Sequence, residues 1–206
     1  MRLITVCGLI WVGVGLTSLG FGDRLISTPM GKKLPHNAAK LEFLSQPSRD
    51  TVFGWFGYGL TDSIELEFYG ESFDSSRITP GLNFSYNYIS PITDLAPGIS
   101  LGVLDITDQT REERAIYAAI TFYFGNVGDL NQNEPTIFTL GGWSRHGGSF
   151  FFNAAFPFSE KIRLIGEHDG NRIGAGVELT PFEGASLKYL FLGGSPTVGF
   201  GFSKRF

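Results

Sequence analysis

Two side chains in the middle of the chain are spaced to act as a nucleophile and its base. Ser144 and His146 are two positions apart, so on a strand they would share one face. A hydroxyl and an imidazole placed together at a membrane interface would suit a lipid hydrolase, provided that a third group orients the base. The neighbouring residues, 143–148, supply no such group. We therefore interpret this stretch as a polar outer turn and predict that the protein is not an enzyme.

Metal binding has weaker support in the sequence. The histidines His36, His146 and His168 lie on three unrelated segments, and no CxxC or HxxxH spacing occurs. The acidic stretch 105–114 could suggest calcium, but it contains Arg111 and Arg114 and lacks the signature of a helix-flanked calcium loop. We predict a solvated loop there, with no metal site and no cofactor.

The charged residues of the strand-like segments form the larger candidate site. They alternate with bulky apolar residues, so they would point into the interior if the apolar residues face lipid. Unpaired charges in a confined interior are costly, which predicts pairing across strands. The result would be either a structural network of ion pairs or a lumen that selects ions. The predicted lumen-facing charges are Lys40, Glu42, Glu65, Glu67, Lys161, Arg163, Glu167, Asp169, Arg172, Glu178, Lys188 and Arg205.

The last ten residues indicate which elements hold these charges. Val198, Phe200, Phe202 and Phe206 fall on one face of an alternating segment, with Lys204 as the break, and small or polar residues fall on the other. This end is similar to the closing strand of bacterial outer-membrane β-barrels, which commonly finish on an aromatic residue. We expect the barrel-assembly machinery to recognise it.

Strand-like segments recur along the rest of the chain at intervals of roughly 10 to 20 residues. We count twelve, with ten as the alternative because 51–58 and 136–143 are poorly patterned. An even number places both chain ends on one side of the membrane. Turns near 60, 94, 130, 159 and 183 would then be periplasmic, and loops near 48, 74, 110, 146, 170 and 194 would face outward.

Composition favours a membrane barrel over a soluble β-sandwich. The chain is 42% hydrophobic and contains 20 Phe and 28 Gly. In the strand-like segments the polar face carries Gly, Ser, Thr and Asn, whereas the apolar face carries large side chains that suit lipid. Phe151, Leu190 and Leu192 fall on the inward face, which favours a partly filled interior. We predict an all-β fold, a closed antiparallel up-and-down transmembrane β-barrel over residues 37–206.

The first residues have the layout of a secretory signal. Residues 1–22 contain a basic start, an apolar run and small residues, which predicts cleavage near Gly20 or Gly22, with an uncleaved anchor as the alternative. Residues 23–36 would form an extended periplasmic segment. Cleavage removes Cys7, the only cysteine, and excludes disulfides. The net charge, −4 before cleavage, argues against a nucleic-acid partner. We expect the outer membrane as the location and its lipid as a partner.

Several short motifs resemble those of the YjbH-like outer-membrane proteins. They are Glu167–Gly170, Gly174–Glu178, Thr180-Pro181, Gly199–Phe206 and, in the centre, Pro97–Asp105, and with the segments around them they cover about half of the chain. We expect no counterpart here of the large extra domains that longer members carry. The resemblance implies a barrel and a non-enzymatic role in exopolysaccharide secretion, with polysaccharide or envelope proteins as partners. The alternative function is a small porin-like passive channel with a charged lumen.

Overall fold

The structure is a computed structural model that describes residues 24–73, 77–110, 113–125, 134–145 and 148–206. The predicted signal peptide and its cleavage site lie outside these residues. No helix in the described part of the chain is long and apolar enough to cross a membrane.

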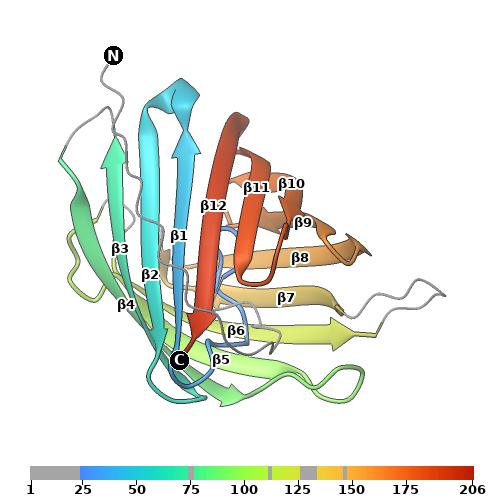
Figure 1. Cartoon of the computed structure of the whole chain (residues 1–206). Coiled ribbons are helices and arrows are strands. Elements are labelled where there is room, and N and C mark those ends of the chain that lie inside the picture. The colour runs from blue at the N-terminus through green and yellow to red at the C-terminus, as the bar shows by residue number, and fades with distance from the viewer. Residues whose placement is uncertain (1–23, 74–76, 111–112, 126–133, 146–147) are drawn as a thin grey trace.

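The described residues form twelve strands and one short 3-10 helix (Figure 1). The strands are β1 (Ala38–Gln46), β2 (Thr51–Gly59), β3 (Ile64–Phe73), β4 (Thr79–Ile89), β5 (Gly98–Leu104), β6 (Ala115–Phe124), β7 (Thr136–Trp143), β8 (Ser149–Ser159), β9 (Ile162–His168), β10 (Ile173–Leu179), β11 (Ala185–Leu192) and β12 (Ser195–Arg205), and the helix is η1 (Pro47–Arg49).

The strands close into a barrel in chain order, each pairing antiparallel with its neighbours. β12 seals the barrel against β1, with Leu41 opposite Phe202 and Phe43 opposite Phe200. Closure leaves no strand edge unpaired, as a hydrocarbon environment requires. The prediction of a closed, twelve-stranded antiparallel barrel is confirmed, and the ten-stranded alternative is wrong.

The connections alternate between the two ends of the barrel. At one end, here called the terminal end, β1 begins and β12 finishes beside each other, and Phe206 donates its backbone N–H to the Asn37 carbonyl. The connections β2–β3, β4–β5, β6–β7, β8–β9 and β10–β11 share this end. The other six lie at the opposite, loop end. This division agrees with the predicted alternation of turns and loops.

Alternation along each strand separates an apolar outer face from a polar inner one. On β4 the side chains of Asn83, Ser85 and Asn87 are buried inside, as predicted. On β12, Val198, Phe200 and Phe202 point outward and stay about half exposed, and Phe206 is exposed at the chain end. An outer band of this kind suits the hydrocarbon layer.

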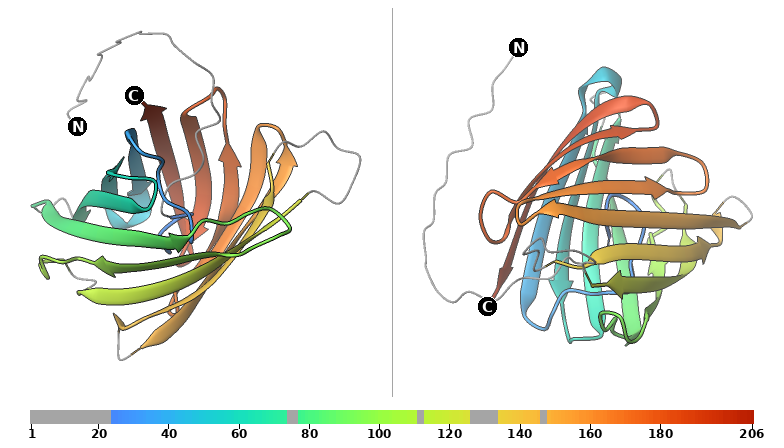
Figure 2. Two further views of the ribbon diagram at one scale, coloured as in Figure 1. Left: turned by 90° about the horizontal axis from the view of Figure 1, so that it is seen from below. Right: turned by 90° about the vertical axis from the view of Figure 1, so that its right-hand side faces the viewer.

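The barrel interior is filled by the chain's own N-terminal residues, here called the inner segment, Arg24–Pro35. Figure 2 shows this stretch, in blue, within the ring of strands. Leu25, Ile26 and Met30 are fully buried and form an apolar cluster with wall residues that include Leu44 and Leu190. The prediction that 23–36 extends into the periplasm is therefore replaced, for residues 24–35, by a position inside the barrel.

Candidate functional site

The inner wall brings together most of the charges predicted from the sequence. Eight of them are buried in the interior or at its rim, and two, Lys40 and Arg172, are half-buried. The eight are Glu42, Glu65, Glu67, Arg163, Glu167, Asp169, Glu178 and Lys188.

Lys161 and Arg205 do not lie in the interior, although they follow the inward pattern. β9 begins at Ile162, so Lys161 belongs to the turn before it and is exposed. Arg205 is the last residue of β12, opposite Ala38, and is also exposed. Strand alternation predicts that a side chain is buried only where neighbouring strands enclose it. At the rim of the barrel no neighbouring strand does so. Arg205 is not a partner of Glu42, since Glu42 lies opposite Gly201, four positions away along β12.

Glu42 instead takes part in a buried three-charge cluster. The Nζ atom of Lys188 lies 2.5 Å from Glu42 Oε1, and that of Lys40 lies 2.7 Å from Glu42 Oε2. Lys188 also donates to the Leu25 carbonyl of the inner segment at 2.6 Å. On the neighbouring strands, Arg163 of β9 donates to Glu178 Oε2 of β10 through both Nε and Nη2, and Glu178 lies opposite Lys188 in the β10–β11 register. The predicted pairing of charges across strands is thus present.

Glu167 holds the turn of the inner segment. Its carboxylate accepts hydrogen bonds from the backbone N–H groups and the hydroxyls of Ser27 and Thr28, with Ser27 Oγ at 2.5 Å and Thr28 Oγ1 at 2.9 Å. Asn153 of β8 adds a bond from Nδ2 to Thr28 Oγ1 at 2.8 Å. Hydrogen bonds to an ionised acceptor are roughly twice as strong as neutral ones, so this carboxylate is a principal anchor.

Further contacts fix the segment as it descends to the terminal end. Gly31 N–H donates to Thr121 Oγ1 at 2.6 Å, and Ser100 Oγ donates to the Met30 carbonyl at 2.9 Å. Leu34 N–H donates to Glu65 Oε2 at 2.7 Å. The backbone polar groups named here are therefore satisfied by wall side chains, which is what burial demands of a segment outside any sheet.

Two cations of the inner segment complete the interior, and the sequence analysis did not identify them. Arg24 forms an ion pair with Glu67, and its guanidinium lies 4.8 Å from the centre of the Trp55 ring. Lys33 donates from Nζ to Tyr117 Oη at 3.1 Å. The segment mixes five charged or hydroxyl residues, at 24, 27, 28, 32 and 33, with apolar ones, but this pattern has no strand period.

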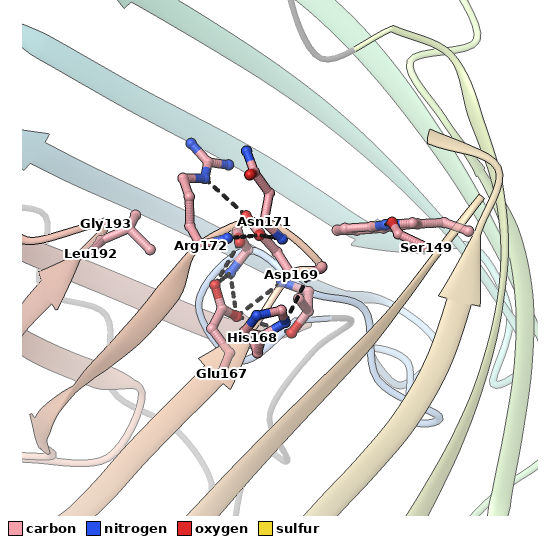
Figure 3. A network of polar contacts seen from close by, with 12 residues as sticks. Ser149, Glu167, His168, Asp169, Asn171, Arg172, Leu192 and Gly193 are labelled. Carbon is pink, nitrogen blue, oxygen red and sulfur yellow. Dashed lines mark hydrogen bonds and ion pairs between the residues drawn. The ribbon is translucent and has the colours of Figure 1, made fainter. Parts of the chain in front are cut away.

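At the loop end, Asp169 and Arg172 organise the β9–β10 turn (Figure 3). Asp169 accepts hydrogen bonds from the backbone N–H groups of Asn171 and Arg172, and Arg172 Nε lies 2.9 Å from its Oδ2. Burial alone would raise the pKa of Asp169, but these N–H donors and the guanidinium charge outweigh it and hold the pKa below the ordinary value.

The structure gives no arrangement for hydrolysis or metal binding within the residues it describes. Ser144 Oγ accepts the backbone N–H of Ile116 at 3.0 Å, while His146 lies outside the described residues. His168 stacks on Phe152, and His36 contacts Leu60 and Asp62 at the terminal end. Across the described ranges, no group of three His, Cys, Asp or Glu could hold a metal ion.

In the acidic stretch 105–114, hydroxyl and backbone groups of the loop itself donate to the Asp105 carboxylate. Asp105 accepts hydrogen bonds from Thr107 and from both the backbone and the side chain of Thr110. Burial would raise the pKa of Asp105, but these donors keep it below its ordinary value. Its carboxylate oxygens are occupied by these donors rather than left open toward a cation.

Known proteins resemble this chain in fold rather than in sequence. The KdgM porin matches with a TM-score of 0.55 and 10% identity, over 82% of this chain and 99% of that one. The KdgM porin in complex with disordered oligogalacturonate matches with a TM-score of 0.54 and 11% identity over the same shares. The outer-membrane protein Omp33 of Acinetobacter baumannii matches at 0.47 and 10% identity, over 82% of this chain and 96% of that one.

The chain thus shares its closed-barrel fold with the KdgM porin. No family model matches the chain, and no curated protein matches it by sequence. Membership of the YjbH-like group is therefore not shown, although the barrel that the resemblance implied is present.

Proposed function

We propose that this chain is a non-enzymatic, porin-like passive channel of the bacterial outer membrane whose passage is narrowed by its own inner segment. The fold and the apolar outer face support the location, and the barrel-assembly machinery would receive the chain through β12. The charged inner wall supports passage of small charged solutes.

One observation carries this proposal: the wall is complete without the inner segment. All twelve strands pair with each other around the full ring, and the described part of the segment contributes no strand to it. Its only β-bridge is internal, between Arg24 and Pro29. The segment can therefore leave the lumen without unpairing the barrel, at the cost of exposing Leu25, Ile26 and Met30.

Planar-bilayer recordings test the proposal. We expect the full chain to show a small conductance with brief openings, and deletion of 25–34 to raise it several-fold. Glu65→Gln in the deletion variant should then shift selectivity away from cations, because a lumen carboxylate attracts them. A barrel that conducts in neither form would contradict the proposal and leave a structural role. Heat-modifiable migration on gels checks that each variant is folded.

A role in exopolysaccharide secretion rests on the YjbH-like motifs alone. Polysaccharide genes beside this one would support it. An interfacial lipid hydrolase stays a minor alternative, and an unchanged lipid-hydrolysis signal in Ser144→Ala would remove it.

A further inference from the structure

The outward face of the barrel carries a hollow over β1, β2 and β3, here called the outer hollow. The outward residues of β2 and β3 pair in three successive rows, which are, from the loop end downward, Val52 with Ser72, Gly54 with Gly70, and Phe56 with Phe68. The middle row has no side chains, and the row above it has short ones. The lowest row consists of two rings that are each about half exposed. The surface is therefore sunken from the loop end down to Phe56 and Phe68.

Side chains of the flanking strands wall the hollow on both sides. Phe43 of β1 lies opposite Gly54, and Ile78, just before β4, lies beside Gly70. Leu41 extends the β1 side. The hollow measures about 500 Å³, the order of size of a small-ligand site, and its outward side chains are almost all apolar.

The glycine pair at the floor is not explained by the strand geometry. Glycine weakens a strand interior and marks a bulge, a sharp bend or the close approach of a ligand or another backbone. The register between β2 and β3 is unbroken along β2, and neither strand bends sharply (Figure 1). Gly142 of β7, another outward glycine, lies between Ala118 and Phe150 instead of opposite a glycine. The Gly54–Gly70 pair therefore favours close approach of a ligand from outside the barrel.

The dimensions of the hollow suit one hydrocarbon chain. The stretch 52–56 spans about 13 Å at roughly 3.3 Å per residue, most of one leaflet of a hydrocarbon core about 30 Å thick. The hollow lies in the outer apolar band, where lipid chains surround the barrel. A second barrel would meet the rings of Phe43 and Phe68 before it reached the floor, because its wall is convex. A thin, flexible chain can lie between the rings and touch the floor.

We propose that the outer hollow holds one acyl chain of lipopolysaccharide, the lipid of the outer leaflet, and that Phe56 and Phe68 limit how deep the chain reaches. The hollow opens toward the loop end, which faces outward in the predicted orientation. Lipid tails are as apolar as the wall, so packing holds the chain in place. A chain in contact with the floor and two walls gains dispersion attraction that a flat wall does not offer. The site does not depend on the proposed channel function.

Native mass spectrometry of the full chain, extracted from outer membranes in a mild detergent, tests the proposal. We expect one lipopolysaccharide molecule to stay bound at collision energies that remove the other lipids. Retention of no lipid, or of a phospholipid in its place, would overturn the proposal. A lipid-free complex of two chains would identify a second copy as the occupant and would also overturn it.

Filling the floor locates the site. Gly70→Leu should lower the retained fraction about tenfold, because the acyl chain loses its contacts with the floor. A Cβ atom at this position would lie 2.9 Å from Cγ2 of Ile78, the end of a flexible side chain that can move. Gly142→Leu is the matched control, because a Cβ atom there would lie no closer than 3.6 Å to its nearest neighbour, the Ser149 carbonyl oxygen. Heat-modifiable migration on gels checks that both variants are folded.

A second pair of variants changes no glycine. Val52→Phe places a ring at the loop-end mouth of the hollow and should lower retention to a similar degree. Val177→Phe is its control, because Val177 points outward on β10, away from the hollow lining. If Gly70→Leu does not fold, Val52→Phe decides alone. Equal retention in a hollow variant and its control would contradict the site.

Discussion

The Glu167 carboxylate accepts hydrogen bonds from both the backbone N–H and the hydroxyl of Thr28, a residue 139 positions earlier, at 3.1 and 2.9 Å. Ser27 donates to the same carboxylate through its backbone N–H and its hydroxyl, so Glu167 binds both residues of the turn of the inner segment. One side chain of β9 thereby anchors the turn of a segment that belongs to no sheet, and other wall side chains hold the rest of it.

Replacing Glu167 with Ala should loosen the inner segment. The buried N–H and hydroxyl groups of Ser27 and Thr28 lose their acceptor, at a cost of about 1–3 kcal/mol. We expect more frequent channel openings in bilayer recordings, with the barrel still closed as shown by heat-modifiable migration. Glu160→Ala is the control, because Glu160 is exposed in the β8–β9 turn. Identical opening frequencies in the two variants would show that Glu167 does not hold the segment.

The Glu42–Lys188 pair gives a second prediction, on stability. Lys188→Met should destabilise the barrel by about 3–5 kcal/mol, because it leaves the Glu42 carboxylate buried with only the half-buried Lys40 as partner. The double variant Glu42→Gln/Lys188→Met should recover much of that loss. Urea unfolding from lipid vesicles measures the free energies, with the exposed Arg205→Met as control. If the losses in unfolding free energy caused by Glu42→Gln and Lys188→Met simply add in the double variant, the two side chains do not stabilise each other.

The inner segment lies so close to Gly98 of β5 that adding one methyl group at this position should displace it. A Cβ atom on Gly98 would lie 2.5 Å from the Gly31 carbonyl oxygen and 2.6 Å from Cδ of Pro91. Gly98→Ala should therefore push the segment away at a cost of about 1–3 kcal/mol and raise conductance. Gly166→Ala is the control, because a Cβ atom on Gly166 would lie 3.7 Å from the Gly174 carbonyl oxygen, an ordinary contact. An unchanged current in Gly98→Ala would contradict the close fit.

The barrel wall was predictable because lipid and lumen impose a period of two on every strand. On β4, Leu82 and Phe84 point outward and Asn83 and Ser85 inward; on β12, Phe200 and Phe202 likewise point outward. The same reasoning failed for Lys161 and Arg205, where the pattern continues past the point at which neighbouring strands enclose a side chain.

The inner segment could not be predicted, because nothing local defines its conformation. Its buried positions are set by contacts with distant strands, such as Ser27 with Glu167 and Gly31 with Thr121. Arg24 and Lys33 are charged residues of types that usually stay exposed, and only the acidic and aromatic wall residues beside them explain their burial. A sequence without strand period is equally compatible with a tail outside the barrel.

The depressed pKa of Asp169 predicts how the β9–β10 turn responds to acid. Because the folded pKa lies below the ordinary value of 3.8, the ionised carboxylate stabilises the fold fully above that value. This stabilisation is lost as the pH falls through the folded pKa, when the proton displaces the bonds from Arg172 and Asn171.

Asp169→Asn should therefore lower the free energy of unfolding by about 1 kcal/mol near neutral pH. The difference from the unmodified chain should be smaller at an acidic pH below the folded pKa than near neutral pH. Urea unfolding at the two pH values measures it, with Glu183→Gln, exposed in the β10–β11 turn, as the control. A difference that stays constant with pH would show that the carboxylate charge does not stabilise this turn.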